Sequence, residues 1–431
     1  MTMPEAYDPL APEVKQHSQA VFETLRAQCP VHHHRMPPSE VERQEASYLV
    51  AEPTTEFWSV FRYEDAVRIL HDPATFSSKE GPGPERMAPM SPDGMLLTAD
   101  APAHRRQRQI ANKAFLPRMV TQRLPLVRSV IDDLIDKVAA RGQCDLMTEI
   151  SFPLTVAMIT DFFGAGGERR DDITRWGAAS IALMGGDAKQ LEAGTMATLE
   201  LFGFLSGIIA ERRAALAAGE KLPDDVLSAM IIADHEGSSF KDEEILMAAH
   251  QFLTAGFEST ATAIGNGIHL LCTNPAERAK LEADWSLVDS AAEEVLRFEA
   301  PVEGTFRTTT KPVTIAGQEL PAGAKVRVVY ASAGRDGARF EDADTFRVDR
   351  PMVDVRGHLA FAVGPHSCLG SALARAELKV AIETVLRRLP GLRLDPDQAA
   401  TRSTALTVNG FTNLPVAWDP AQARPRLWGE Q

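Results

Sequence analysis

A single cysteine near the end of the chain has the surroundings of a reactive or metal-binding thiolate. Cys368 stands in the stretch FAVGPHSCLG, residues 361–370, between Gly364 and Gly370 and two residues after His366. The stretch that follows, SALARAELKVAIETVLRRL, is rich in helix-forming residues and contains no Gly or Pro, so a helix is predicted to begin just after the thiol. Because a helix N-terminus favours negative charge, this position would stabilise a thiolate.

Several chemistries are open to Cys368 on these residues alone. It could be a buried core cysteine, the common fate of a free thiol, or a nucleophile activated by His366, although no third partner is evident. A zinc site is disfavoured, because no set of Cys and His at ligand spacing accompanies it. A thiolate without other ligands from its own chain is also suited to haem iron, since the porphyrin supplies four nitrogens and leaves an axial site.

Charged and hydroxyl side chains recur at helical spacing in other segments. Glu294 and Arg297, in EEVLR, are three residues apart and can meet on one helix face, although an ordinary surface ion pair would show the same spacing. In LTAGFEST, residues 253–260, Gly256 is a poor helix residue that precedes the acid Glu258 and two hydroxyls. Such hydroxyls can bond back to carbonyls and bend a helix, so this segment could also be a kinked core helix.

A third segment, DAPAHRRQRQIANKAF at residues 100–115, is strongly basic. His104 and Arg108 lie four residues apart, about one helical turn, and could face the same anion. On these residues alone, a basic surface helix is the preferred explanation of this spacing.

The order Phe361-x-x-Gly364-x-His366-x-Cys368-x-Gly370 resembles the cysteine-ligand signature of the cytochrome P450 family. The other segments occur in the order that this family has, and the resemblance covers nearly the whole chain. It implies haem b, with Cys368 as the iron ligand and dioxygen as co-substrate. It also implies that Glu294 and Arg297 are a buried pair that braces the loop before the cysteine, with Arg350 or Arg347 as a third partner.

The resemblance implies further roles. Ala255 and Gly256 would make room for dioxygen on the distal wall, and Glu258 would relay protons together with a hydroxyl. Members of the family carry Thr directly after this acid, whereas this chain has Ser259 followed by Thr260, so either hydroxyl is a candidate. The residues implied to contact the cofactor are His104, Arg108, Arg307, His366, Phe361, Gly370 and Ala255.

The implied activity is that of a haem-thiolate monooxygenase. The substrate is expected to be an apolar terpenoid, steroid or aromatic hydrocarbon, because the segments expected to wall the pocket are apolar. Peroxygenase or non-oxygenating chemistry, or a non-catalytic haem-based sensor or carrier, are the alternatives. The pocket residues implied are Met95, Leu96, Leu97, Met184, Val302 and Val408.

Electrons are expected from a separate iron–sulfur ferredoxin with its own reductase. The sequence shows no flavin or nicotinamide fingerprint after a strand and no cysteine set for an iron–sulfur cluster. Basic residues that flank the cofactor segments could steer an acidic ferredoxin, although scattered solvated charges are the alternative. They are Arg105, Arg106, Lys113, Arg118, Arg375 and Lys379.

These residues must be positioned by a mainly α fold with a small β region, which the resemblance makes the cytochrome P450 fold, a triangular helical prism with haem between two long helices. A helix over Asp242–Thr273 would be about 48 Å long at ~1.5 Å per residue. We expect one domain, residues 1–431, with its β-rich portion at about 45–62, 302–330 and 400–418. SYLVAEPTTEFWSVFR, at 47–62, predicts a hairpin, and YEDAVRILHD predicts the helix after it.

The composition of the chain restricts the classes of partner and the cellular compartment that we expect. A net charge of -14 argues against a nucleic-acid-binding protein. The 4 cysteines have no paired spacing, which fits a reducing cytoplasm. No signal peptide is visible at the N-terminus. The longest uncharged run, residues 259–276, is interrupted by Thr, Asn, Gly and His, so no membrane span is expected.

Overall fold

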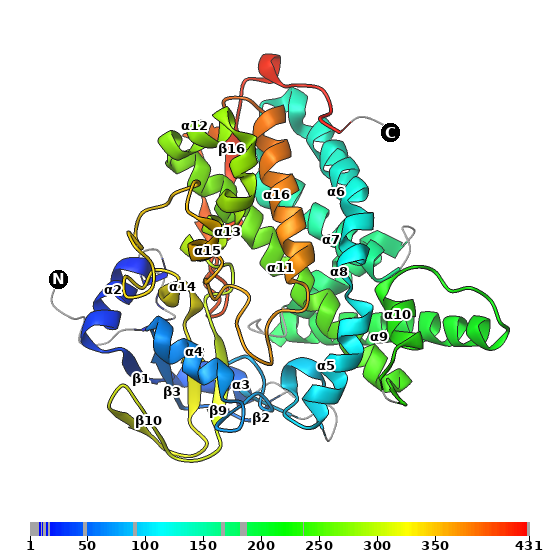
Figure 1. Cartoon of the computed structure of the whole chain (residues 1–431), viewed down its shortest axis with the longest axis vertical. Coiled ribbons are helices and arrows are strands. Elements are labelled where there is room, and N and C mark those ends of the chain that lie inside the picture. The colour runs from blue at the N-terminus through cyan, green and yellow to red at the C-terminus, as the bar shows by residue number, and fades with distance from the viewer. Residues whose placement is uncertain are drawn as a thin grey trace.

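Helices form most of the molecule, and the strands of the main sheet gather at one end of it (Figure 1). The computed structural model describes residues 8–9, 11, 14–15, 18–45, 50–88, 93–164, 169–181, 188–235 and 237–428. The helices are α2 (Ser18–Gln28), α3 (Pro38–Glu45), α4 (Tyr63–His71), α5 (Ala103–Ala114), α6 (Pro117–Val138), α7 (Phe152–Phe162), α8 (Arg170–Ile181), α9 (Ala188–Ala217), α10 (Val226–Ile232), α11 (Asp242–Thr273), α12 (Pro275–Ala283), α13 (Val288–Phe298), α14 (Tyr330–Ala333), α15 (Met352–Val355) and α16 (Ser371–Arg388).

The strands are short. They are β1 (Val31–Arg35), β2 (Val50–Glu52), β3 (Glu56–Val60), β4 (Phe76–Ser77), β5 (Arg86–Met87), β6 (Gln143–Asp145), β7 (Asp234–His235), β8 (Ser238–Ser239), β9 (Thr305–Thr309), β10 (Val313–Ile315), β11 (Gln318–Leu320), β12 (Lys325–Val328), β13 (Arg393–Leu394), β14 (Thr401–Arg402), β15 (Phe411–Asn413) and β16 (Pro415–Ala417). Seven of them lie outside the three ranges in which strands were expected: β1, β4, β5, β6, β7, β8 and β13.

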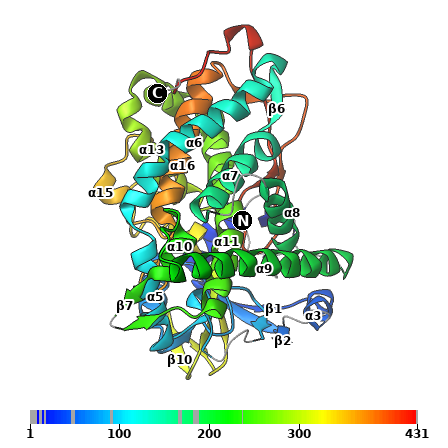
Figure 2. The same cartoon turned by 90° about the vertical axis from the view of Figure 1, so that its right-hand side faces the viewer.

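The long helix α11 has the predicted bounds, Asp242–Thr273. From Thr260 to Ile268 every residue is buried, because this part of the helix packs against α7, α13 and α16 and is apolar or small apart from Asn266, whose amide donates to two backbone carbonyls. The predicted helix after the cysteine is α16, which also packs against α6. In both views these helices run through the thick part of the molecule (Figures 1 and 2).

The main sheet has the strand order β1-β3-β12-β9-β4, with only the β3–β12 pair parallel. The predicted hairpin over 47–62 is wrong, because β2 pairs with β5 and β3 pairs with β1 and β12. Burial explains the difference. Four of the five residues of β3 are buried and fill both faces of a central strand, whereas β2 is a partly exposed edge. The helix predicted after it is α4.

One stretch of α9, Glu192–Ala217, is long and apolar enough to cross a membrane by length and composition, a stretch that the sequence reasoning did not single out. Its most apolar window has a mean hydropathy of 1.5 and is 28% buried. In the structure α9 packs along α8 and also contacts α10 and α11, so part of its apolar surface belongs to the protein's own core (Figure 2).

Candidate functional site

The loop before α16 is a tight turn that fixes the backbone of Cys368. The Cys368 N–H donates to the Phe361 carbonyl at 2.9 Å, and the Ser367 N–H donates to the Gly364 carbonyl at 3.1 Å. Gly364 has φ +76, and a Cβ there would lie 2.4 Å from the carbonyl oxygen of Leu70, so the turn requires glycine. A Cβ at Gly370, in contrast, would meet nothing within 4 Å.

The Cys368 thiol differs from the buried thiols elsewhere in the chain. Burial raises the pKa of Cys144 to about 12 and that of Cys272 to about 11, so both are inert core thiols. Burial also raises the pKa of Cys368, but the Gly370 and Ser371 N–H groups and the charges of Arg108 and Arg375 act in the opposite direction. These are the groups that stabilise a thiolate at a helix N-terminus.

The position of Cys368 also indicates an internal cavity. Its side chain has accessible surface, yet protein surrounds it closely enough for desolvation to be the largest influence on its pKa. Ala255, in the middle of the core helix α11, is likewise exposed, although Leu253 and Phe257 beside it are buried. Groups with both properties line an internal space, and we infer that Cys368 and Ala255 belong to the wall of one.

A cluster of cationic side chains lies beside the cysteine loop. The rings of His104, from α5, and His366 stack with centroids 3.9 Å apart. Burial, followed by the neighbouring His104, Arg307 and Arg108, lowers the pKa of His366 to about 3. Burial and the same two arginines lower the pKa of His104, and only Asp100 opposes them. The lowered pKa keeps both rings neutral beside two arginines that few carboxylates balance, so the set fits an anionic ligand such as the propionates of haem.

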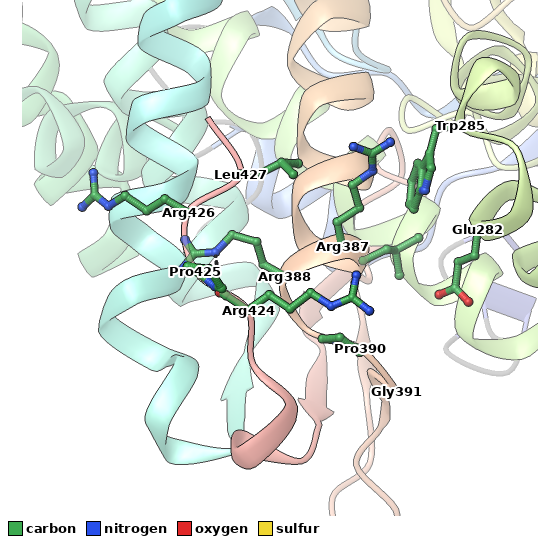
Figure 3. Close-up of a pocket in the computed structure, with 11 residues that line it drawn as sticks. Glu282, Trp285, Arg387, Arg388, Pro390, Gly391, Arg424, Pro425, Arg426 and Leu427 are labelled. Atoms are coloured by element: carbon green, nitrogen blue, oxygen red, sulfur yellow. Dashed lines mark hydrogen bonds between the residues drawn. The ribbon is translucent and has the colours of Figure 1, made fainter. Parts of the chain in front are cut away.

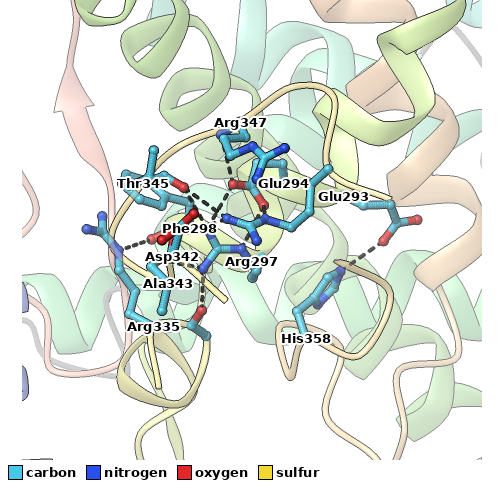
Figure 4. A network of polar contacts seen from close by, with 12 residues as sticks. Glu293, Glu294, Arg297, Phe298, Arg335, Asp342, Ala343, Thr345, Arg347 and His358 are labelled. Carbon is cyan, nitrogen blue, oxygen red and sulfur yellow. Dashed lines mark hydrogen bonds and ion pairs between the residues drawn. The ribbon is translucent and has the colours of Figure 1, made fainter. Parts of the chain in front are cut away.

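The predicted acid–arginine pair is fully buried and has a third partner (Figure 4). Arg297 donates to both carboxylate oxygens of Glu294, at 2.7 and 2.8 Å, and Arg350 donates to the same carboxylate at 3.0 Å. Arg347 contributes only its backbone N–H, at 2.9 Å. The remaining guanidinium donors bind backbone carbonyls between residues 334 and 345, so this cluster holds the long loop that leads to the cysteine.

A second carboxylate of the same helix was missed by the sequence reasoning. Glu293 accepts from His358 Nε2 at 2.9 Å and from Arg375 Nε at 2.6 Å. His358 Nδ1 accepts the Ala360 N–H at 3.2 Å, which places the ring proton on the nitrogen that faces Glu293. Arg375 lies 4.3 Å from the centre of the Phe361 ring. Glu293 therefore connects α13 to both ends of the cysteine loop.

The electrostatics of Glu293 agree with this connection. Burial alone would raise the pKa of Glu293, but hydrogen bonds and charge from His358 and Arg375 outweigh it and lower the pKa to about 2. The only signal in the sequence was the doubled acid in EEVLR, whose partners lie 65 and 82 residues further on.

On α11, the two candidate hydroxyls have different surroundings. Ser259 is half-buried, lies one turn after Ala255 and donates to its carbonyl at 2.9 Å. Thr260 is buried in the core with 6% of its surface exposed. Glu258 is half-buried, and burial raises the pKa of its carboxyl. Ala255, Glu258 and Ser259 therefore keep accessible surface on α11, whereas Thr260 keeps almost none.

Gly256 has a different role from the one the family resemblance implied. A Cβ there would lie 2.9 Å from Cδ1 of Ile159, so its missing side chain admits α7. One residue further on, the Thr155 hydroxyl of α7 donates to the Phe257 carbonyl at 3.1 Å. The close packing of α7 and α11 at this turn leaves Ala255 to face the open space.

The expected pocket residues fall into two groups. Met95 and Leu96 are buried and contribute to the core cluster that includes α11, while Leu97 is 41% exposed. Val302 and Val408, 106 positions apart in the chain, form an isolated antiparallel bridge. Met184 lies outside the described residues.

Fewer residues of the expected basic patch have an unpaired charge at the surface than the sequence suggested. Arg106 pairs with Glu244, and Lys113 donates to the Asp234 carbonyl. Arg375 and Lys379 are engaged with Glu293 and Asp289, at 2.6 Å each. Across the described part of the chain, Arg105, Lys113 and Arg118 are the exposed residues of this set without an ion-pair partner, and of these only Lys113 has a side-chain hydrogen bond.

A cavity of about 510 Å³ lies at the far end of α16 from the cysteine, under the C-terminal segment (Figure 3). Most of its arginines are already neutralised: Arg388 pairs with Asp132 at 2.8 Å, and Arg426 pairs with Asp136 at 2.8 Å. The cavity shares no lining residue with the groups around Cys368, so we do not assign the chemistry to it.

Known proteins resemble this chain over most of its length. The family model described as Cytochrome P450 matches residues 45–401. The chain is 36% identical to "Cytochrome P450 107B1" of Saccharopolyspora erythraea, over 83% of this chain and 88% of that protein. It is 34% identical to "Cytochrome P450 monooxygenase PikC" of Streptomyces venezuelae, over 95% and 92%. The structure of cytochrome P450 CYP109Q5 from Chondromyces apiculatus superposes with a TM-score of 0.81, at 31% identity, over 97% of this chain and 99% of that chain.

Proposed function

This chain belongs to the cytochrome P450 family, and we propose that it inserts one atom of dioxygen into an apolar substrate of sterol or terpenoid size, with electrons from a ferredoxin. Members of the family bind haem b and use dioxygen. Similar proteins are named "Steroid C26-monooxygenase", "Vitamin D(3) 25-hydroxylase" and "6-deoxyerythronolide B hydroxylase", which supports a bulky, mostly apolar substrate. The whole chain, residues 1–431, would form one such domain.

In this proposal Cys368 is the iron ligand, and the cation cluster binds the haem propionates. The thiolate is held by the Gly370 and Ser371 N–H groups at the start of α16. When bound, haem supplies the oxygen-activating chemistry, which an axial thiolate favours by donating electron density. Anionic propionates would offset the charges of Arg307 and Arg108, which lower the pKa of both His104 and His366. Binding of the cofactor would therefore raise the pKa of the two histidines.

Proton delivery falls to two residues of α11. Burial raises the pKa of Glu258, so its carboxyl holds a proton at a higher pH than an exposed acid would. Ser259 is one turn after Ala255, and its hydroxyl, which donates to the Ala255 carbonyl at 2.9 Å, would release that bond when it passes a proton on. We propose that Ser259, and not the buried Thr260, is the hydroxyl that transfers protons into the cavity.

The pocket walls would orient the substrate by apolar contact. The residues proposed for these walls, Met95, Leu96, Val302 and Val408, have no ionisable side chain. Such a wall discriminates by shape and holds the substrate through burial of its apolar surface. This supports a steroid-like or terpenoid skeleton over a small polar molecule.

The electron donor is proposed to be an acidic ferredoxin in the cytoplasm. Arg105 and Arg118 are exposed on or beside the helices α5 and α6, and α5 also carries the cofactor residue Arg108. Exposed cations there would steer an acidic partner towards the cofactor. Reversing the charge of Arg118 should lower the rate of ferredoxin-driven turnover and reduce its dependence on ionic strength.

The observation that carries the proposal is the place of Cys368 directly before α16, where the Gly370 and Ser371 N–H groups and Arg108 act against the rise that burial causes in the pKa of its thiol. The decisive assay is the reduced carbon monoxide complex, which should show the red-shifted Soret band of a haem-thiolate, and Cys368→Ser should abolish it. Product should then form only with dioxygen and an electron supply, and carry one labelled oxygen atom from labelled dioxygen. Turnover that needs peroxide despite full electron supply, or no turnover of any ligand that binds, would contradict the monooxygenase assignment.

A further inference from the structure

The two turns that carry Val302 and Val408 are joined into a single unit. The Glu303 N–H donates to the Thr407 carbonyl at 2.7 Å, and the Asn409 N–H donates to the Pro301 carbonyl at 2.9 Å. Asn409 Nδ2 also donates to the Ala300 carbonyl at 3.0 Å. This unit lies on α11, since a Cβ at Gly410 would come 2.2 Å from Cγ2 of Thr262.

A buried cluster of three charged side chains lies behind this unit. The Glu303 carboxylate accepts from Lys15 Nζ at 2.7 Å and from Arg327 Nη2 at 2.5 Å. Both cations also donate to the Leu406 carbonyl, Arg327 at 2.6 Å and Lys15 at 3.4 Å. The cluster therefore holds both turns at once: Glu303 belongs to the first turn and Leu406 to the second.

The pairing register of the sheet shows which side the cluster occupies. β12 pairs with β9 so that Arg327 lies opposite Phe306 and Val326 lies opposite Arg307. Because side chains alternate between the faces of a strand, Arg327 is on the opposite face from Arg307. Arg307 faces the cationic cluster beside Cys368, so the cluster of Lys15, Glu303 and Arg327 supports the pocket wall from behind.

The cluster depends on one acid. Within the described residues, Glu303 is the only carboxylate that pairs with Lys15 or Arg327. All three side chains are at most 5% exposed, and Nε and Nη1 of Arg327 have no acceptor there. Loss of the Glu303 charge would leave two buried cations unbalanced, and their separation would displace the segments that they hold.

We propose that the buried Lys15–Glu303–Arg327 cluster is a positioning device that fixes the turns at 301–303 and 406–409 against each other, and thereby sets the shape of the pocket wall and the size of ligand it accepts. The inference rests on the proposed function, because it takes these turns as walls of the substrate pocket. It assigns a role in specificity to Lys15, which lies far from the cofactor segments in the sequence.

The test uses ligands that coordinate haem iron whatever the native substrate is. Imidazole is too small to reach the pocket wall, whereas clotrimazole binds through the same ring and carries a bulky apolar group. The ratio of their Kd values in the haem-loaded enzyme reports wall geometry, and the carbon monoxide band reports the intact thiolate. Glu303→Gln should change this ratio at least fivefold while the band is kept.

The matched control removes an equally buried ion pair elsewhere. Asp132→Asn takes one carboxylate from Arg388, whose side chain is 3% exposed, near the far end of α16, and leaves Asp136 as its second partner at 2.5 Å. It should lower the melting temperature, though less than Glu303→Gln, and change the Kd ratio less than twofold. A triple variant, Lys15→Met with Glu303→Leu and Arg327→Met, removes the buried charges, so it should regain stability but keep an altered ratio.

The outcomes distinguish failure of the positioning role from failure of the proposed function. A Kd ratio within twofold of the wild type in Glu303→Gln, or in the triple variant if the single one does not fold, would overturn the positioning role. An equal change in Asp132→Asn would overturn it as well, because the effect would then be general loosening. A wild-type protein without the red-shifted band would instead overturn the proposed function, and this inference with it.

Discussion

Replacing Glu293 by Gln measures how strongly α13 braces the cysteine loop. Glutamine has nearly the shape of a protonated glutamate, so the substitution imitates protonation in place. The hydrogen bonds and charge from His358 and Arg375 lower the pKa of Glu293 from its ordinary value near 4.5 to about 2. At 1.36 kcal/mol per pKa unit, this difference corresponds to about 3 kcal/mol of stability at pH 7.

The effect depends on pH in a defined direction. Because the folded-state pKa of Glu293 lies below its unfolded value, the unfolded chain binds more protons, and the stabilisation is complete above about pH 4.5 and lost as the pH falls towards 2. At pH 4 about 0.8 kcal/mol of it should already be gone. The variant lacks this titrating group, so its deficit relative to the wild type should shrink as the pH falls from 7 to 4.

Thermal melting of the haem-loaded protein measures both effects. A chain of 431 residues has an unfolding entropy of about 0.9 kcal/mol/K, so Glu293→Gln should melt about 3 °C below the wild type at pH 7. The control is Asp289→Asn on the same helix, which breaks an exposed pair with Lys379 and should cost at most about 0.5 kcal/mol. A variant that melts within 1 °C of the wild type, or a gap that does not narrow at pH 4, would refute the bracing role.

Three further changes test other parts of the site. Gly364→Ala should cost at least about 3 kcal/mol, since it combines a φ of +76 with a Cβ 2.4 Å from the Leu70 carbonyl, while Gly370→Ala should cost at most about 1 kcal/mol; denaturant unfolding compares them. Ser259→Ala should lower the product formed per electron pair about tenfold or more, whereas Thr260→Ala should mainly reduce the melting temperature, and peroxide release is the measure of lost coupling. Ala362→Gly should stabilise the loop by up to about 1 kcal/mol, because Ala362 has φ 50, and glycine relieves more strain there than it costs in chain entropy; melting temperature is the readout.

The elements that carry the site were predictable where the signal is local. The bounds of α11 and the helix after Cys368 follow from runs of helix-forming residues, and the Glu294–Arg297 pair follows from a spacing of three. In these cases the partners lie on one turn or one segment. The residues that interact are then also close in the sequence, so the sequence pattern reveals the interaction.

Long-range pairing was beyond the sequence pattern. The residues 47–62 alternate like a hairpin, yet β3 takes β1 and β12 as neighbours because its buried residues need partners on both sides. Similarly, EEVLR does not say that its first acid binds His358, nor that Arg350 and not Arg347 supplies the third side chain of the neighbouring cluster. Those choices depend on where distant loops pass in the folded chain.

Gly256 shows a third reason why the sequence alone does not predict the site. Its place in the motif indicated space for a ligand, but the structure uses the missing side chain to admit Ile159 of α7. A glycine in a helix signals close approach without saying what approaches. Only the packing of α7 on α11 decides that the open space lies at Ala255 instead.

The acids between residues 293 and 303 explain how irregular segments around the site acquire fixed positions. Glu293 holds the cysteine loop, Glu294 holds the loop at 334–350, and Glu303 joins the turns at 301–303 and 406–409 to the sheet. None of these segments can be fixed by a continuous ladder of backbone hydrogen bonds, so a buried carboxylate with two or three donors takes over that task. Each cluster is costly to desolvate and therefore sensitive to the loss of a single charge. We infer that the region from α13 to the turn at 301–303 is the common support from which the thiolate side and the substrate side of the cavity are both positioned.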